Sequence, residues 1–139
     1  MIEPAGTTTL FGTTVCRLRA AGCVFAEDEA SELLRATRDP SRLDLLTRRR
    51  EEGEPLEHVL GSMRFGRLRL AVGPGVFVPR QRSLLLARLA ARLARARRAS
   101  VLLEAFAGAA PIASSVARAV PSVSAHASDV DAAALRFAR

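Results

Sequence analysis

The order of apolar and polar positions divides the chain into a helical first part and a second part that contains strands. Over residues 14–61, apolar side chains recur at helical spacing in four short stretches, with breaks such as Gly22 and Gly53. Helices of this length are not stable alone and must pack on one another, so we predict a small helical bundle. Residues 1–13 are rich in Thr and Gly and show neither period. We interpret them as a loose leader.

The period of the pattern changes after Gly61. Leu68, Leu70 and Val72 alternate with other residues, as in a strand with one buried face, and Gly66 allows the chain to turn. Residues 62–80 are therefore predicted to form a β-hairpin linker. Residues 83–98 return to helical spacing, with one stripe of leucines and another of arginines. The leucines are Leu85, Leu89 and Leu93, and the arginines are Arg88, Arg92 and Arg95. Such a helix could lie on a membrane or on nucleic acid, but we expect its leucine stripe to pack against a sheet and its arginine stripe to face water.

Residues 101–129 follow the order strand, loop, helix, turn and strand. The apolar run at 101–103 is typical of a parallel strand buried on both faces, residues 112–119 form a helix, and residues 123–127 alternate as a second strand. The predicted fold class is α/β. It consists of a small N-terminal helical bundle, a β-hairpin linker and the first βαβ part of a Rossmann-like sheet, with an exposed edge at 123–127 that favours self-association.

Each of the two predicted strands ends at a carboxylate, Glu104 and Asp129. The loop between the first strand and its helix, Phe106–Ala110, has small residues apart from Phe106 and contains one glycine, Gly108. The interval between Gly108 and Asp129 is close to the ~20 residues that separate a nucleotide-binding loop from the acid that binds a ribose hydroxyl. This loop has one glycine where a dinucleotide-binding loop has three, so an ordinary βαβ unit remains an alternative.

Composition narrows the classes of partner. The net charge is +7 and all 21 basic residues are arginine, which we interpret as charge spread over a solvated surface. Direct contact with nucleic acid is not expected, except through the ribosome, because the chain has no Trp or Tyr for stacking on bases. No apolar run is long enough to cross a membrane. Cys16 and Cys23 lack the spacing of a metal or redox pair, and we expect buried thiols in a reducing cytoplasm.

Three blocks resemble one family, the protein glutamine N5-methyltransferases that modify peptide chain release factors. Residues 53–61, Gly-Glu-Pro-Leu-Glu-His-Val-Leu-Gly, are similar to the family's Gly-Glu-Pro-Leu-Gln-Tyr-Ile-Leu-Gly. In residues 65–80, a hairpin leads to Val-Phe-Val-Pro-Arg, which is like the family's Leu-Ile-Pro-Arg. The third block, the 106–110 loop with Asp129 and residues 132–139, is common to class I methyltransferases. The resemblance covers residues 15–139.

The resemblance implies S-adenosylmethionine-dependent transfer of a methyl group to the glutamine side-chain amide of a Gly-Gly-Gln loop in a release factor. Residues 14–61 would recognise this substrate, and residues 81–139 would begin the cofactor-binding methyltransferase domain. Asp129 would bind the cofactor's ribose, and Glu104 stands in the place of the usual acid after the first strand. The residues that correspond to the family's cofactor site are Glu104, Phe106, Ala107, Gly108, Ala109, Ala110 and Asp129.

Two departures from the family bear on activity. Ala110 stands where the family has glycine, and the Asn-Pro-Pro-Tyr motif that holds the glutamine amide is absent from the 139 residues. We therefore name no catalytic residue and expect an N-terminal methyltransferase fragment that is inactive alone. The alternatives are a non-catalytic docking module for a release factor or RNA, and a decayed remnant without a selected role.

Overall fold

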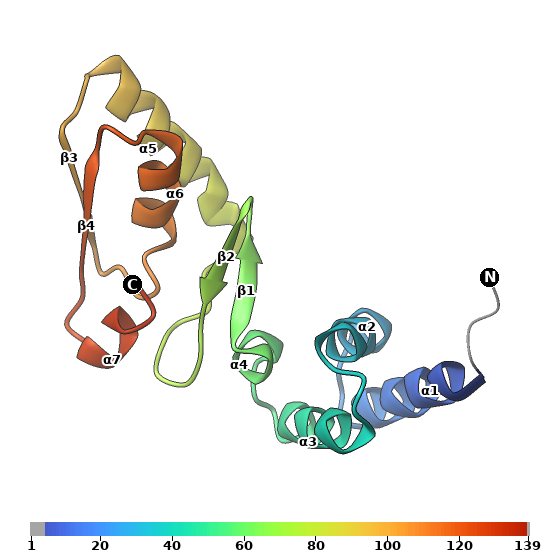
Figure 1. The fold of residues 1–139 in the computed structure, drawn as a ribbon. Helices are drawn as coiled ribbons and strands as arrows, with labels where there is room; N and C mark the ends of the chain where they lie inside the picture. Colours follow the sequence, from blue (N-terminus) through green and yellow to red (C-terminus); the bar gives the residue numbers. More distant parts are fainter. Residues whose placement is uncertain (1–4, 139) are drawn as a thin grey trace. The chain divides into compact units, whose positions relative to one another are not determined.

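The computed structural model describes residues 5–138, with side chains from residue 9 onward. The chain is α/β and divides into two compact units, Met1–Leu60 and Gly61–Arg139 (Figure 1). The boundary lies within one residue of the end predicted for the helical bundle. Each unit is described by itself below.

The first unit contains only helices among its described residues. Its core is formed by apolar side chains from all four helices, with Leu18, Ala26, Ala30 and Leu33 fully buried. Ala26, Ala30 and Leu33 follow one another at intervals of four and three residues. This spacing places them on one face of the second helix. The helices are α1 Ala5–Ala20, α2 Ala26–Ala36, α3 Pro40–Glu51 and α4 Leu56–Leu60.

The predicted loose leader is wrong from Ala5 onward, because α1 begins there. Residues 1–4 lie outside the described part of the chain. The hydroxyls of Thr13 and Thr14 donate to the carbonyl oxygens of Thr9 and Leu10, one turn earlier, at 2.9 and 2.8 Å. Threonines can therefore continue a helix by bonding to it, although their composition alone suggests a loop.

Ion pairs join the helices of the first unit. Arg17 on α1 contacts Asp44 at 2.8 Å and Glu51 at 2.6 Å, both on α3. Arg50 on α3 contacts Glu29 on α2 at 2.6 Å, and both of these side chains are largely buried. All ion pairs formed within residues 5–138 lie between residues 17 and 54. The charged side chains of this unit thus serve its own packing.

The second unit begins with the predicted hairpin. Strands β1 Ser62–Phe65 and β2 Leu68–Ala71 pair antiparallel, and Gly66 turns the chain at a φ of 58°. The side chain of Phe65, the last residue of β1, is fully buried. The elements that follow are η1 Gln81–Ser83, α5 Leu84–Ala96, β3 Val101–Ala105, α6 Pro111–Ala119, β4 Ser124–Ser128 and α7 Ala132–Leu135.

Strands β3 and β4 are parallel and are connected by α6, as in a Rossmann-like βαβ unit. Leu102 packs toward the helices, together with Val116 and Val123. The prediction that β3 is buried on both faces is wrong, because Val101 and Leu103 on its other face are 60% and 64% exposed. Within the described residues nothing covers that face, so the strand has the apolar composition of a buried strand but only one packed side.

Helix α5 buries its alanine face and not the leucine face that the prediction chose. Its buried residues are the alanines Ala87, Ala91 and Ala94, whereas the predicted core stripe of Leu85, Leu89 and Leu93 is exposed. Ala91 and Ala94 lie against residues of α6 and its flanking turn, where small side chains allow two helices to approach closely, and Ala87 packs in the cluster that contains Phe65 of the hairpin. Both faces of α5 are apolar, so periodicity identified an amphipathic helix but did not select the face that packs.

The structure bears on two predictions from composition, the burial of the two cysteines and the lack of a membrane-spanning helix. Cys23 is buried as expected, but Cys16 is exposed, so the prediction of two buried thiols is wrong for Cys16. Within residues 5–138, no helix has the length and apolar character needed to cross a membrane. A cytoplasmic location stays a prediction.

Candidate functional site

The loop after β3 has an unusual backbone. Phe106, Gly108 and Ala110 have φ values of 54°, 53° and 50°, so every second residue of the loop lies in the left-handed region. Glycine adopts this conformation freely, whereas residues with a Cβ adopt it at a cost. The loop therefore has a backbone that suits three glycines, although only the middle position has one.

The two sequence features that predicted a site are in direct contact. The Gly108 N–H donates to Oδ2 of Asp129 at 2.8 Å, although the two residues are 21 positions apart. The parallel register places Ala105 opposite Ser128, and the Ala107 N–H extends the pairing to the Ser128 carbonyl oxygen. The loop and Asp129 therefore lie together at the carboxyl edge of the two strands, where ligands bind in open α/β sheets.

Asp129 is held in its ionised form by backbone donors. Its pKa lies below the ordinary value because the Asp131 and Gly108 N–H groups donate to its carboxylate. The Asp131 N–H donates to Oδ1 at 3.0 Å, and the Val130 N–H contributes to the same shift, so the carboxylate uses part of its four-site acceptor capacity on its own backbone. The carboxylate is fixed in place and can still accept hydrogen bonds from neighbouring hydroxyls.

Glu104 acts on the other side of the loop, at the start of α6. Its carboxylate accepts from the N–H groups of Ile112 at 3.4 Å and Ala113 at 2.6 Å. Burial raises the pKa of Glu104, and these two backbone donors oppose that rise. A carboxylate is favourable at a helix N-terminus, which otherwise has unpaired N–H groups. Glu104 thus fixes the loop to its helix, and both of its oxygens already have backbone partners.

The other predicted site residues differ in exposure. The Phe106 side chain is 91% exposed, whereas Ala107, Ala109 and Ala110 are buried. Ala110 precedes Pro111 in the first turn of α6, and its methyl group lies in a cluster with Ala107 and Ala113. The structure thus brings Glu104, Gly108 and Asp129 to one edge and points Phe106 into solvent. Sequence reasoning identified the stripe of Arg88, Arg92 and Arg95 but missed the groove, away from this loop, that the stripe lines together with Arg67 and Arg118.

Comparisons with known proteins give three curated relatives, each named release factor glutamine methyltransferase. The protein from Corynebacterium glutamicum is 45% identical over 53 residues, which is 38% of this chain and 19% of that protein. The protein from Streptomyces coelicolor is 37% identical over 93 residues, or 66% of this chain and 33% of the relative. The protein from Gloeobacter violaceus is 37% identical over 95 residues, or 68% of this chain and 33% of the relative.

These matches confirm the resemblance seen in the sequence blocks. The matched stretches cover between 19% and 33% of the relatives' own lengths. No protein-family model matches the chain.

Proposed function

Because this chain is related over part of its length to the release factor glutamine methyltransferases, we propose that its second unit forms part of an S-adenosylmethionine site. The observation that carries the proposal is the hydrogen bond between the Gly108 N–H and the Asp129 carboxylate. It holds a loop with small residues and an ionised acid at the same edge of a parallel strand pair.

The residues of this edge fit an adenosyl ligand in their chemistry. Asp129 would accept hydrogen bonds from the ribose hydroxyls, since its carboxylate retains acceptor capacity. Ala107, Gly108 and Ala109 would allow the ligand to approach the backbone closely. Glu104 would position the loop through the start of α6. When bound, S-adenosylmethionine supplies an electrophilic methyl group.

The proposed substrate is the glutamine side chain in the Gly-Gly-Gln loop of a peptide chain release factor, with the first unit as the recognition surface. Methyl transfer requires the amide nitrogen to be held in line with the methyl group, and such alignment supplies up to about 7 to 11 kcal/mol of the barrier. The Asn-Pro-Pro-Tyr sequence that the resemblance implies for this task is not present in the 139 residues. We therefore propose that residues 1–139 bind cofactor without catalysing transfer by themselves.

Isothermal titration of the chain with S-adenosylmethionine tests the site. Asp129→Asn removes the charge and should weaken binding about tenfold or more, as expected for the loss of charge-assisted hydrogen bonds. Asp131→Asn is the matched control, because Asp131 lies two residues away and accepts from the Ala133 N–H at the start of α7. Absence of binding, or equal losses in both variants, would contradict the cofactor site.

A methyl-transfer assay with radiolabelled cofactor and a release factor tests the second part of the proposal. We expect no turnover by residues 1–139. Turnover by this polypeptide would show that the missing motif is not required, and the substrate clamp would then have to lie within the present residues.

A further inference from the structure

The excess positive charge belongs to one half of the chain. Residues 61–139 contain 13 arginines and 3 acidic residues, whereas residues 1–60 contain 8 arginines and 11 acidic residues. The excess charge is therefore not in one tail, as expected, but it is concentrated in the second unit. A concentration of one sign of charge in one unit produces a local field that attracts anions.

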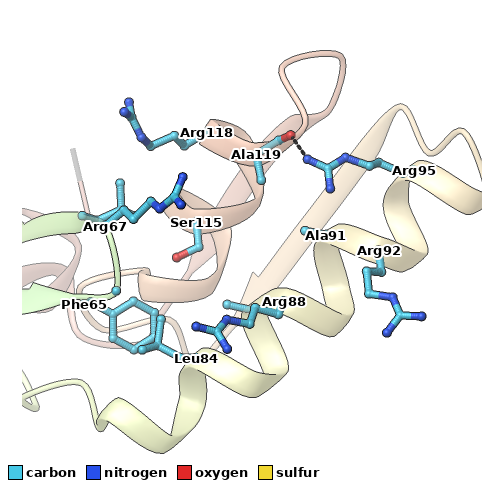
Figure 2. A pocket seen from close by; sticks show the side chains of 13 residues that line it. Phe65, Arg67, Leu84, Arg88, Ala91, Arg92, Arg95, Ser115, Arg118 and Ala119 are labelled. Atoms are coloured by element: carbon cyan, nitrogen blue, oxygen red, sulfur yellow. Dashed lines mark hydrogen bonds between the residues drawn. The ribbon is translucent and has the colours of Figure 1, made fainter.

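Five of these arginines line a single groove of about 940 Å³ in the second unit. The groove lies between the β1–β2 turn, α5 and α6 (Figure 2). No acidic residue and none of the loop residues 106–110 contribute to its lining. Its arginines are Arg67, Arg88, Arg92, Arg95 and Arg118.

The guanidinium groups in the groove are largely free of internal partners. Arg95 donates to the carbonyl oxygen of Ala119, while Arg67, Arg88, Arg92 and Arg118 form no ion pair within the residues described. In the first unit, by contrast, Arg17, Arg49 and Arg50 each contact a carboxylate. The donors of the groove are thus available to an anion from outside the chain.

The cations are arranged as a track with two sides. Arg88, Arg92 and Arg95 follow one another along α5, at intervals of about 6 and 4.5 Å along the helix axis. In Figure 2, Arg67 extends from the turn toward α6 and Arg88 extends from α5 toward Phe65 and Leu84, whereas Arg92 and Arg118 extend outward from α5 and α6 at the rim. Between the arginines the lining is apolar and mostly small, from Leu84, Ala87 and Ala91. This arrangement suits an elongated ligand with a regular series of negative charges.

The absence of Trp and Tyr argues against stacking on bases but not against contacts to phosphate, so, contrary to the expectation from composition, we propose that this groove binds the phosphodiester backbone of a single-stranded nucleic acid. Guanidinium groups bind phosphate oxygens with two parallel hydrogen bonds, and a phosphodiester chain carries a charge at every repeat. An acidic peptide fits less well. Its own N–H and C=O groups would need partners, and the backbone groups of α5 and α6 are already bonded within their helices.

The groove also determines the character of the binding. The lining has no Tyr or Trp, and its one aromatic residue, Phe65, is fully buried. Bases therefore have no exposed ring to stack on, and binding is independent of base sequence. Because contacts to phosphate release counterions, affinity falls steeply as salt increases.

Fluorescence anisotropy with a labelled oligouridylate of about twelve nucleotides tests the proposal. The triple variant Arg88→Ala, Arg92→Ala, Arg118→Ala should bind at least about tenfold more weakly than the unmodified chain at 50 mM salt. The slope of log affinity against log salt should become shallower by about 2, since each single-strand phosphate contact contributes about 0.7. The matched control Arg82→Ala, Arg97→Ala, Arg136→Ala removes the same charge outside the groove and should lose less than about threefold.

Three outcomes would overturn the proposal. They are the absence of salt-dependent binding by the unmodified chain, equal losses in the two triple variants, and equally tight binding of a polyglutamate of the same charge. If circular dichroism shows that the groove variant does not fold, the single variant Arg67→Glu takes its place. Arg67 is exposed in the hairpin turn, and its reversal should still weaken RNA binding more than Arg69→Glu on the neighbouring strand.

Discussion

The helical unit and the strand-containing unit satisfy their side chains in different ways. In the first, leucines fill the core and arginines pair with carboxylates on neighbouring helices. In the second, alanines fill the contact between α5 and α6, Leu85, Leu89 and Leu93 of α5 are exposed, and no arginine forms an ion pair within residues 61–138. Arginines thus hold helices together in the first unit, whereas those of the second unit are available to partners.

The backbone differs in the same direction. The residues with positive φ in the described part of the first unit are glycines, Gly22 and Gly53. The second unit places Arg98, Phe106 and Ala110 in the left-handed region as well. Local strain of this kind persists where surrounding structure imposes it, and it concentrates at functional sites. The strained residues of the described chain thus lie in the second unit, and two of them, Phe106 and Ala110, belong to the candidate loop.

The largest expected effect on the free energy of unfolding is the difference between a buried leucine of the first unit and an exposed leucine of the second. Leu33→Ala should lower the free energy of unfolding by about 3 kcal/mol, because Leu33 is fully buried and its loss leaves a cavity. Leu93→Ala on α5 should change it by less than about 0.5 kcal/mol, because Leu93 is 59% exposed. Urea unfolding followed by resolved amide NMR signals from each unit measures both. A large effect of Leu93→Ala would mean that the outer face of α5 is covered.

The next effect separates paired from unpaired arginines. Arg50→Ala leaves the largely buried Glu29 without its partner and should cost about 2 kcal/mol. Arg92→Ala should stay within about 0.5 kcal/mol, since Arg92 has no carboxylate partner in the described chain. The same urea titration reports both values. Equal costs would contradict the division between structural and available charges.

A smaller effect tests the strained loop. Phe106→Gly should stabilise the second unit by about 0.5 kcal/mol, because glycine adopts a positive φ without a steric cost and this exposed ring loses few contacts. Phe106→Ala is the control, since alanine removes the ring and keeps the Cβ. If both variants have the same thermal stability, the backbone at this position is not strained.

The smallest effect concerns pH and has opposite signs for two groups of carboxylates. Hydrogen bonds from Arg17 lower the pKa of Glu51 and Asp44, those from Arg49 lower that of Glu54, and backbone donors lower that of Asp129. Their stabilisation is present at neutral pH and is lost as pH falls below about 4.5 through the lowered values. Burial raises the pKa of Glu104, so its ionised form is disfavoured and protonation relieves that cost.

Amide hydrogen exchange at pH 6 and pH 4, corrected for intrinsic rates, measures this difference. Protection should fall on acidification in α1, in α3 and at the Gly108 N–H, which donates to Asp129, and should fall less at the Ala113 N–H, which donates to Glu104. An equal loss of protection at Gly108 and Ala113 would contradict the assigned signs.

Parts of this structure follow from local sequence alone. Hydrophobic periodicity predicted the four helices, the hairpin at Gly66 and the strand–helix–strand segment, because each depends on spacing within a few residues. The 21-residue interval between Gly108 and Asp129 predicted a loop and an acid that serve one site, and the structure has the two residues in direct contact. Carboxylates at the ends of parallel strands meet at one edge in any such unit, so this part of the site needed no tertiary information.

Tertiary packing decided what periodicity left open. On α5 both the alanine and the leucine faces are apolar, and the close approach of α6 selected the smaller side chains. The positive φ of Phe106 and Ala110 is imposed by the connection from β3 to α6. The sequence shows how many arginines residues 61–139 contain. Five of them line one groove only because the β1–β2 turn, α5 and α6 meet in the folded unit. Local spacing determined which elements form, and competition between faces for the same core determined which residues remained available for contact.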